Sequence, residues 1–469
     1  MRPLLLSTTF LILLTLCLVF LWGSLSRRNS FALANGWDQL WCLLADRRLI
    51  AFLLLGASFN VSLRLVTGYI NPRDYVQDAV AARQFLRHES LYPADMPAMG
   101  AAVVAAPMAG RQWLESNPIL RPEFDMLAIT APANAHPPFL GLLSVPALAA
   151  FGLRGGFLAT SIFSAVLLCL SLFLIVRELF PTPSNARFLA ILGLTFGWHS
   201  VSSLLRSAQP AVLLLFLILI SWLLLRRGRP WAAGIPIGIA ACIQAFPALL
   251  LLYFALRYWR SLLSALATVA AISLSVWACT IPGTFLQWLA TVDLISRDFI
   301  PSRLNLSLAG IFVGFARSLH LPVDAKLIGL LSLALVAAIL AIWLKPWIRV
   351  QESIQRLDVE FALFTVAMLL ASPLFWSRYL AILLLPLVIL LRYRSSPSQP
   401  CTPFALLWVL LALSIPDLTL EALNSSLSTI LGPPLAWLLS SLVTLAVLIL
   451  SLWTARLPRN PQSTAKAGV

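Results

Sequence analysis

The sequence predicts an all-α, polytopic membrane protein with about 11–14 transmembrane helices. Of its 469 residues, 60% are hydrophobic and only 11% are charged, whereas a soluble domain carries about 25% charged residues. Apolar runs near the length of a helical span, about 20 residues, recur along the whole chain. The basic residues lie in short clusters between these runs. One integral domain follows, because no polar stretch is long enough to build a second core.

The apolar runs are continuous, which favours helices, since the strands of a membrane barrel would alternate. The N-terminal run lacks a small-residue cleavage site after it, so we expect a retained helix. The runs that fit a complete span are 3–22, 49–68, 155–176, 187–204, 209–225, 261–281, 327–344, 359–375, 378–392, 403–420 and 432–453. Three further segments are ambiguous, namely 137–152, 231–255 and 305–319.

The net charge of +15 raises the question of nucleic-acid binding. The basic clusters do not form one stripe, however, and this excludes nucleic acid as the expected partner. They follow the positive-inside pattern of cytoplasmic loops, with membrane lipids as neighbours. The main clusters are Arg27–Arg28, Arg47–Arg48, Arg226–Arg229, Arg257–Arg260, Lys345–Arg356 and Arg392–Arg394.

With the basic clusters in the cytoplasm, the N-terminus lies outside and the C-terminal tail inside. The eleven complete spans satisfy this only if each ambiguous segment returns to the side it left. Segment 231–255 has a basic cluster at each end and is interrupted by Pro236 and Pro247. We therefore expect a hairpin of two half-helices, which is tolerated where it lines a cavity.

The longest polar interruption, 69–136, lies on the outer face in this topology. It holds seven of the 18 acidic residues, including Asp74 and Asp78. Its segment Tyr75–His88 lacks Gly and Pro and predicts a short helix, with Asp74 at its start. Asp74 is therefore either a helix N-cap or a base that takes a proton from a hydroxyl. A second outer loop covers about 282–304.

Other polar residues lie at the outer ends of the spans. His136 precedes Pro137-Pro138, where the loop re-enters the membrane, and is either an interfacial anchor or a site residue. Gln209 could bond a sugar hydroxyl or a phosphate. An outer arginine such as Arg206 needs an anionic partner, which is a lipid headgroup, an acid or a substrate phosphate.

Two segments combine packing with possible function. Small residues four apart, at Gly234 and Gly238, allow close helix packing, and the mid-membrane Gln244 must find a hydrogen-bond partner. An outer turn carries Trp376, Arg378 and Tyr379. It is either an aromatic belt with a snorkelling arginine or a phosphate clamp. The six cysteines form no CxxC pair, so we expect neither a metal site nor a disulfide frame.

The order of these features resembles glycosyltransferase family 87, a group of bacterial membrane enzymes with the type-C glycosyltransferase fold. The resemblance spans about 70–395 and rests on an ordered set of motifs. These are Asp74-Tyr75, Leu91-Tyr92-Pro93, His136-Pro137-Pro138-Phe139, Gln209, Arg226–Gly234 with Gly238, Asn305-Leu306-Ser307 and Ser372-Pro373-Leu374-Phe375-Trp376. Departures are Gln244 for the usual Lys, Arg378 for a frequent His, and Ala208 for Gly. Gln244 removes a positive charge that Arg378 could restore.

The resemblance implies an inverting transferase of a hexose, often mannose. The donor would be a polyprenyl-phosphate sugar, and the acceptor a glycolipid or glycan on the outer face of the cell membrane. Phosphate is a good leaving group, so neither a metal nor another cofactor is implied. Asp74 would be the base, with Asp78 or Asp293 as alternatives. Arg378, Arg303, Arg206 and Gln209 would bind the donor phosphate, and His136, Tyr75, Gln244, Trp376 and Tyr379 would orient the substrates.

On this interpretation, residues 1–48 form an extra N-terminal helix and a basic linker, 49–395 the catalytic core, and 396–469 the C-terminal helices and tail. Two other classes stay open, a lipid or small-molecule transporter or flippase and a non-catalytic membrane scaffold. Transporters place ionisable groups near the midplane. Here the charges lie at the outer ends, which favours surface chemistry on a lipid, while the Gln244 and Arg378 departures keep the scaffold open.

Overall fold

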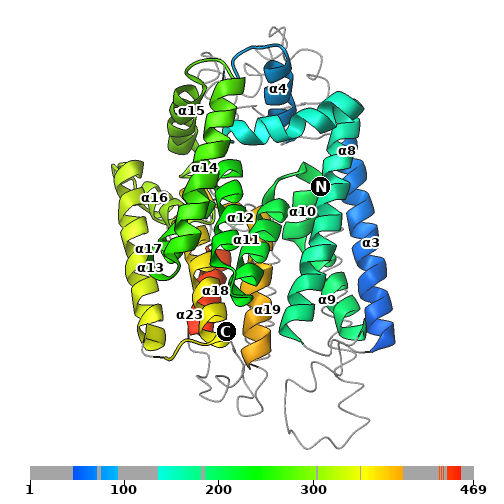
Figure 1. Cartoon of the computed structure of the whole chain (residues 1–469), viewed down its shortest axis with the longest axis vertical. Coiled ribbons are helices and arrows are strands. Elements are labelled where there is room, and N and C mark those ends of the chain that lie inside the picture. Colours follow the sequence, from blue (N-terminus) through cyan, green and yellow to red (C-terminus); the bar gives the residue numbers. More distant parts are fainter. Residues whose placement is uncertain are drawn as a thin grey trace, which may run out of the picture.

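A computed structural model describes residues 46–70, 75–92, 136–180, 185–302, 305–348, 350–394 and 441–455, together with positions 433, 435 and 437. Every regular element within these ranges is a helix (Figure 1). The predicted class, an all-α polytopic membrane protein, is therefore confirmed. The predicted spans 3–22 and 403–420 lie outside the described residues, so the total of about 11–14 crossings stays a prediction.

Four described helices are long and apolar enough to cross a membrane: α3 (Arg47–Ile70), α8 (Pro138–Leu179), α14 (Trp259–Cys279) and α17 (Ala325–Ile348). A fifth candidate is the pair α9 (Asn185–Gly197) and α10 (His199–Ser207), which bends by 63°. Shorter helices complete the bundle. They are α11 (Ala211–Arg226), α12 (Pro230–Ile243), α16 (Leu308–Ser318), α18 (Ile354–Ala371), η2 (Ser377–Leu383), α19 (Leu384–Arg394) and α23 (Leu442–Ala455).

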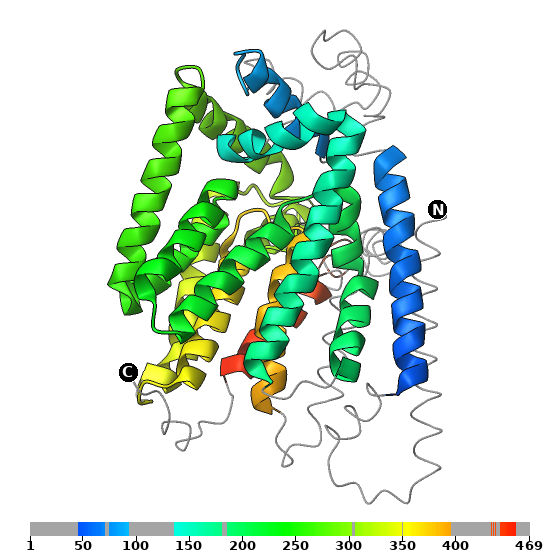
Figure 2. The ribbon, with the colours of Figure 1, turned by 45° about the vertical axis from the view of Figure 1, so that its right-hand side comes forward.

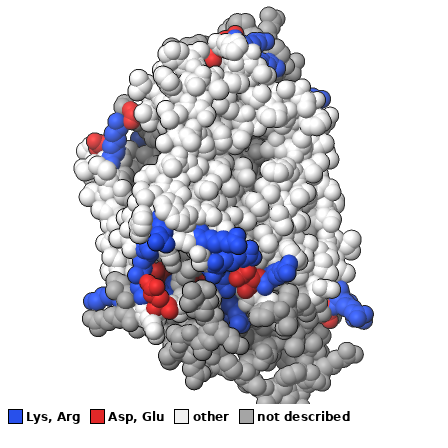
Figure 3. All heavy atoms as spheres, in the orientation of Figure 1, with Lys and Arg blue, Asp and Glu red and all other residues white. Residues whose placement is uncertain are grey.

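The bundle has two chemically different ends. The basic end, defined by Arg226, Arg227, Arg257 and Arg356, is the lower end in Figure 3, where the blue side chains gather. The opposite end, here called the upper end, carries α4 (Tyr75–Leu86), α15 (Thr284–Phe299) and the beginning of α8 (Figures 1 and 2). The helices of the two predicted outer segments, α4 and α15, therefore lie at the same end of the molecule (Figure 1).

Segment 231–255 is the hairpin that the sequence predicts. It consists of α12, η1 (Phe246–Leu249) and α13 (Leu250–Arg257), and the chain breaks at Gln244, which is extended (φ −145°, ψ 140°). The Ser261 hydroxyl donates a hydrogen bond to the carbonyl of Pro230 at 2.6 Å, so the two ends of the segment lie side by side. The prolines and the two flanking basic clusters therefore predicted correctly that the segment returns to the side from which it starts.

The other two ambiguous segments also stay on the side from which they start. The first part of α8 runs across the upper end, and the helix then turns down at Gly152, whose φ of 66° lies in the left-handed region. Helix α16 is only 11 residues long. After it, Lys326 at the start of α17 lies 2.8 Å from Asp293 of α15, which places this connection at the upper end.

Glycines set the closest helix contact of the hairpin. A Cβ added at Gly238 would lie 2.7 Å from the carbonyl oxygen of Ala265, and one at Gly234 would overlap the carbonyl of Ser261. Helices α12 and α14 therefore touch through their backbones, as the small residues predict. The outward faces of α14 and α17 are apolar and exposed, with Trp277 and Ile342 among their residues. Lipid is the solvent that suits such a surface.

A buried ionic network fastens the basic end. Asp358 of α18 is fully buried and accepts hydrogen bonds from Trp222 Nε1 at 2.9 Å, from the Tyr393 hydroxyl at 2.6 Å and from Arg226. On the same helix, Glu360 binds Arg257 through two hydrogen bonds of 2.6 and 3.0 Å. The basic clusters at 226 and 257 were interpreted only as cytoplasmic surface. Each also neutralises a buried carboxylate, and together they tie both ends of the hairpin to α18.

Candidate active site at the upper end

The first turn of α4 is buried against α8 and the end of α10. Tyr75 is almost fully buried and packs edge-on against Phe157, with ring centroids 6.2 Å apart, beside Ala208. Its hydroxyl occupies the space that a Cβ on Gly156 would need. Burial raises the pKa of Tyr75 to about 12, so the side chain stays neutral and acts as a donor or an orienting group.

Asp78 and His136 form a buried pair one turn further along α4. The Nδ1 atom of His136 lies 2.7 Å from Oδ1 of Asp78, and the two residues are 7% and 3% exposed. The Tyr92 hydroxyl donates a hydrogen bond to the backbone carbonyl of His136. A carboxylate held by an imidazole is a unit that accepts and passes a proton. The sequence named Asp78 only as an alternative base, although it lies within the predicted helical segment Tyr75–His88.

The end of α10 brings Arg206 and Gln209 to the same region. A Cβ at Gly68, near the end of α3, would overlap the backbone carbonyl of Arg206, so the two helices touch there. Ala208 closes α10 in the left-handed region with a φ of 50°. Gln209 is 2% exposed, and its Oε1 atom accepts no hydrogen bond. A buried acceptor in this state is ready for a ligand hydroxyl or amide.

Two motifs far apart in the sequence form one hydrogen-bonded unit. The Asn305 amide donates to the Pro373 carbonyl at 2.8 Å and accepts from the Phe375 N–H at 2.9 Å. Ser307 donates to the same Pro373 carbonyl at 3.1 Å. Asn305 therefore fixes the turn that carries Trp376, a positioning role that the sequence alone did not reveal.

The turn at 372–379 also packs against the break in the hairpin. The guanidinium of Arg378 lies 5.7 Å from the centre of the Trp376 ring. Tyr379 packs edge-on against Phe246, with centroids 5.1 Å apart, and Phe246 follows Gln244 closely in the chain. The Nε2 atom of Gln244 is buried and donates no hydrogen bond. Because η2 also packs against α10, Arg378 and Gln209 belong to one contiguous region.

Comparison with known proteins decides which functional class the protein belongs to. The model of glycosyltransferase family 87 matches residues 134–373, just over half of the chain. The chain belongs to glycosyltransferase family 87. It is accordingly a membrane glycosyltransferase, as the ordered motifs predicted. No curated protein and no solved structure matches it.

The family 87 match contains His136, Gln209, Gln244 and Asn305. Two residues to which the family resemblance gave roles, Asp74 and Arg303, lie outside the described residues. The alternative base Asp293 is half-exposed and forms an ion pair with Lys326, which makes it a weaker candidate than Asp78. Among the described residues, no group of three His, Cys, Asp or Glu side chains could hold a metal ion.

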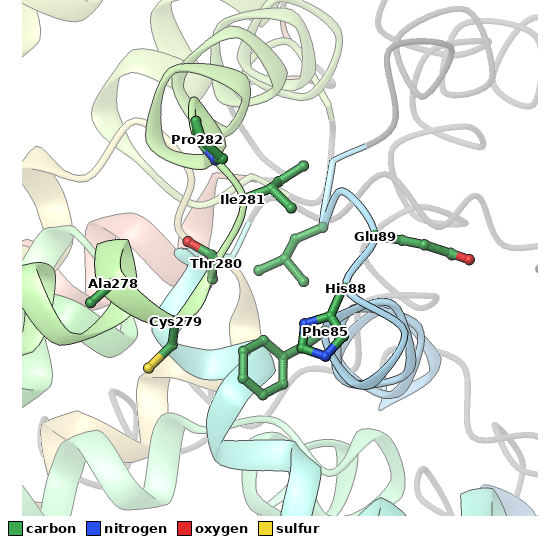
Figure 4. Close-up of a pocket in the computed structure, with 9 residues that line it drawn as sticks. Phe85, His88, Glu89, Ala278, Cys279, Thr280, Ile281 and Pro282 are labelled. Carbon is green, nitrogen blue, oxygen red and sulfur yellow. The ribbon is translucent and has the colours of Figure 1, made fainter.

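A family 87 glycosyltransferase must also admit an acceptor, and the upper end has a cleft of about 560 Å³ beyond the C-terminal end of α4. It lies between the residues that follow α4 and the connection from α14 to α15 (Figure 4). The lining residues are Phe85, His88, Glu89, Leu91 and Ala278–Pro282. None of them was a predicted site residue. The walls are mainly apolar, and Figure 4 shows the Glu89 side chain directed away from Thr280 and Ile281.

Proposed function

We propose that this protein transfers a hexose, mannose being the first candidate, from a polyprenyl-phosphate sugar to a glycolipid or glycan acceptor. The observation that carries the proposal is the buried Asp78–His136 pair, which anchors the helix beginning directly after Asp74. A lipid-linked donor suits a membrane glycosyltransferase whose helix α4, with Tyr75 and Asp78, lies at one end of an apolar helix bundle (Figure 1). The donor chain would remain in lipid while its sugar reaches this end.

The chemistry proposed is a single displacement with inversion. An acceptor oxygen forms a bond to the anomeric carbon while the bond from that carbon to the phosphate oxygen breaks. The lipid phosphate leaves with the electron pair, and Asp74 takes the proton of the acceptor hydroxyl. Positive and polar groups stabilise the departing phosphate, for which Arg206, Arg378 and Arg303 are the candidates. Because the phosphate leaves readily, the proposed reaction needs no metal ion.

The remaining candidates would orient the substrates. Gln209 offers an unused buried acceptor, and Gln244 an unused buried donor. Both suit sugar hydroxyls, which donate and accept. Trp376 and Tyr379 supply aromatic surface beside them, while Tyr75 and His136 hold the α4 segment against α8. We propose 49–395 as the catalytic core, flanked by 1–48 and 396–469.

The proposed location is the cell membrane, with the active face outside the cytoplasm. The basic end carries the buried ionic network and the exposed Arg227, Arg229 and Arg260. By the positive-inside rule this end faces the cytoplasm, so the upper end faces outward.

A lipid transporter or flippase is the second candidate. Two interrupted helices favour it, the bent pair of α9 and α10 and the hairpin broken at Gln244, because transporters commonly place substrate sites at such breaks. The non-catalytic scaffold has no comparable support.

The test is sugar transfer by the purified protein in liposomes. Radiolabelled polyprenyl-phosphate hexoses and nucleotide hexoses are supplied separately with a membrane glycolipid extract. The proposal predicts incorporation from the lipid-linked donor alone. Incorporation from the nucleotide sugar would contradict the donor class. Movement of labelled lipid between leaflets without any incorporation would point to the transporter.

A further inference from the structure

The cleft beyond the C-terminal end of α4 adjoins the lipid-facing surface of the bundle. One of its walls includes the end of α14, a helix long and apolar enough to cross a membrane. The last turns of α14 are apolar on the outside, with Leu274 and Trp277 each 64% exposed, and Leu286 at the start of α15 is 73% exposed. The two walls are joined where the Ser90 hydroxyl donates a hydrogen bond to the side-chain oxygen of Gln287 at 2.8 Å. A lipid chain can therefore reach the cleft from the side of the bundle.

The cleft is large enough for part of a ligand and has mainly apolar walls. Its volume of about 560 Å³ falls within the range of small-molecule sites, roughly 300–1,000 Å³. Phe85, Leu91 and Ile281 supply apolar surface, and Figure 4 shows Ile281 directed toward the segment that follows α4. The described residues that line the cleft include the carboxylate of Glu89 but no Lys or Arg. Such walls suit an apolar chain with an uncharged polar head better than they suit a phosphate.

His88 gives the cleft a polar group and occupies an unusual backbone position. Helix α4 closes there through two hydrogen bonds, from the N–H of His88 to the carbonyl of Phe85 at 3.0 Å and from the N–H of Glu89 to the carbonyl of Gln84 at 2.9 Å. Glycine is the usual residue at this kind of helix end, because the backbone is left-handed, and His88 has a φ of 56°. A larger side chain held in such a conformation beside a cleft is a candidate for function. Its imidazole can donate to one sugar hydroxyl and accept from another.

The length of α4 separates this cleft from the place of the proposed chemistry. Phe85 lies two helical turns beyond Asp78, which is about 10 Å along the helix axis, and Asp74 precedes the helix. In a polyprenyl-phosphate sugar only the phosphate stands between the reacting carbon and the chain. A donor whose chain ended in the cleft would therefore hold its sugar away from the proposed base, whereas an acceptor glycolipid can cover this distance with its head group.

We infer that the cleft holds the lipid end of the acceptor, a glycolipid with an uncharged sugar head that reaches along α4 toward Asp74, an assignment that rests on the proposed function. The apolar walls take the part of the lipid chain next to the head group. His88 forms hydrogen bonds with the sugar nearest the chain, and the outermost sugar presents the hydroxyl that is glycosylated.

Photochemical labelling tests the assignment without sugar transfer. The full-length protein in nanodiscs is illuminated with a decyl disaccharide that carries a diazirine in its chain, and the labelled peptides are mapped by mass spectrometry. We expect saturable labelling around Phe85 and Ile281, with competition by the unlabelled disaccharide lipid but not by polyprenyl phosphate. Ala278→Trp, which fills the cleft, should weaken this labelling about 10-fold by excluding the chain. Ala290→Trp is the matched control, because Ala290 is exposed on α15 and does not line the cleft, and its labelling should stay within about twofold.

His88→Gly separates a binding role of the imidazole from a structural one. Glycine suits the left-handed position, so the unfolding temperature should rise, while loss of the imidazole should weaken labelling about 3–10-fold. Unchanged labelling of this variant would overturn the role of His88.

Equal labelling of the wild-type protein and Ala278→Trp would overturn the assignment of the cleft. Labelling spread over the outward faces of α14 and α17, or displacement of the label by polyprenyl phosphate, would overturn it as well. Transfer by Ala278→Trp with the wild-type KM for the acceptor would overturn the assignment and leave the proposed function standing. Saturable binding in the cleft without transfer from any donor would refute the proposed function alone.

Discussion

His136 Nδ1 lies 2.7 Å from the Oδ1 atom of Asp78, and this contact joins the start of α8 to the first turns of α4. It connects two residues near opposite ends of the long polar segment 69–136. The contact fixes the position of α4, the helix that begins directly after Asp74. This helix is held at the upper end by a buried polar contact as well as by apolar packing.

The pair should contribute measurably to stability. Asp78→Ala leaves the buried Nδ1 of His136 without its acceptor, so we expect a loss of about 1–3 kcal/mol and a lower unfolding temperature in detergent. Glu89→Ala, which removes an exposed carboxylate just beyond the same helix, should change stability by less than about 0.5 kcal/mol. Equal effects of the two substitutions would show that the contact contributes nothing.

The packing of Tyr75 on α8 can be tested by a double-mutant cycle. Gly156→Ala places a methyl group where the Tyr75 hydroxyl lies, and should destabilise the protein by about 1–3 kcal/mol. Tyr75→Phe removes that hydroxyl and should recover a large part of the loss in the double variant. Additive effects in thermal unfolding would mean that the two residues do not touch.

Sequence patterns predicted those parts of the fold that depend on local physics. Continuous apolar runs gave α3, α14 and α17, and Pro236 with its flanking arginines gave the hairpin. Polar contacts between residues far apart in the sequence were not predicted, because a single sequence does not show which distant residues come into contact. Asp358 lies just before the predicted span 359–375 and Glu360 within it, and neither was given a partner. Only the folded chain brings Arg226 and Arg257 to them.

The buried ionic network should matter more than exposed ion pairs. Asp358→Ala leaves Arg226, the Trp222 N–H and the Tyr393 hydroxyl without their common acceptor, and should cost about 3–5 kcal/mol. Asp293→Ala removes only the half-exposed pair with Lys326 and should cost less than about 1 kcal/mol. The comparison is made by thermal unfolding of both variants in the same detergent. A small effect at Asp358 would show that the buried ionic network does not stabilise the basic end.

The contact between α12 and α14 should tolerate no side chain. Gly238→Ala would bring a methyl group to 2.7 Å from a backbone oxygen of α14, forcing the helices apart at a cost of about 1–3 kcal/mol. Gly329→Ala, on α17 with open space around it, should be neutral or stabilise by up to about 1 kcal/mol through helix propensity. Opposite signs in unfolding temperature confirm the packing, and equal tolerance at both positions contradicts it.

The candidate site was foreseen in outline. The motifs placed His136, Gln209 and the 372–379 turn at the outer ends of spans and Gln244 within the membrane, and α10 and η2 do pack together. The pairing of His136 with Asp78 and the contact of Gly68 with the Arg206 carbonyl at the end of α10 were not foreseen. Both depend on the helix contacts of α4 with α8 and of α3 with α10, which no local pattern encodes.

The most direct test compares transfer by the wild-type protein and Asp74→Asn in liposomes, with radiolabelled polyprenyl-phosphate hexose and glycolipid extract. The substitution keeps the shape and capping ability of the side chain but removes its basicity. We predict that incorporation is lost while the unfolding temperature and the binding of polyprenyl phosphate stay unchanged. Incorporation at the wild-type rate by folded Asp74→Asn would contradict the account and move the base elsewhere, with Asp78 the next residue to replace.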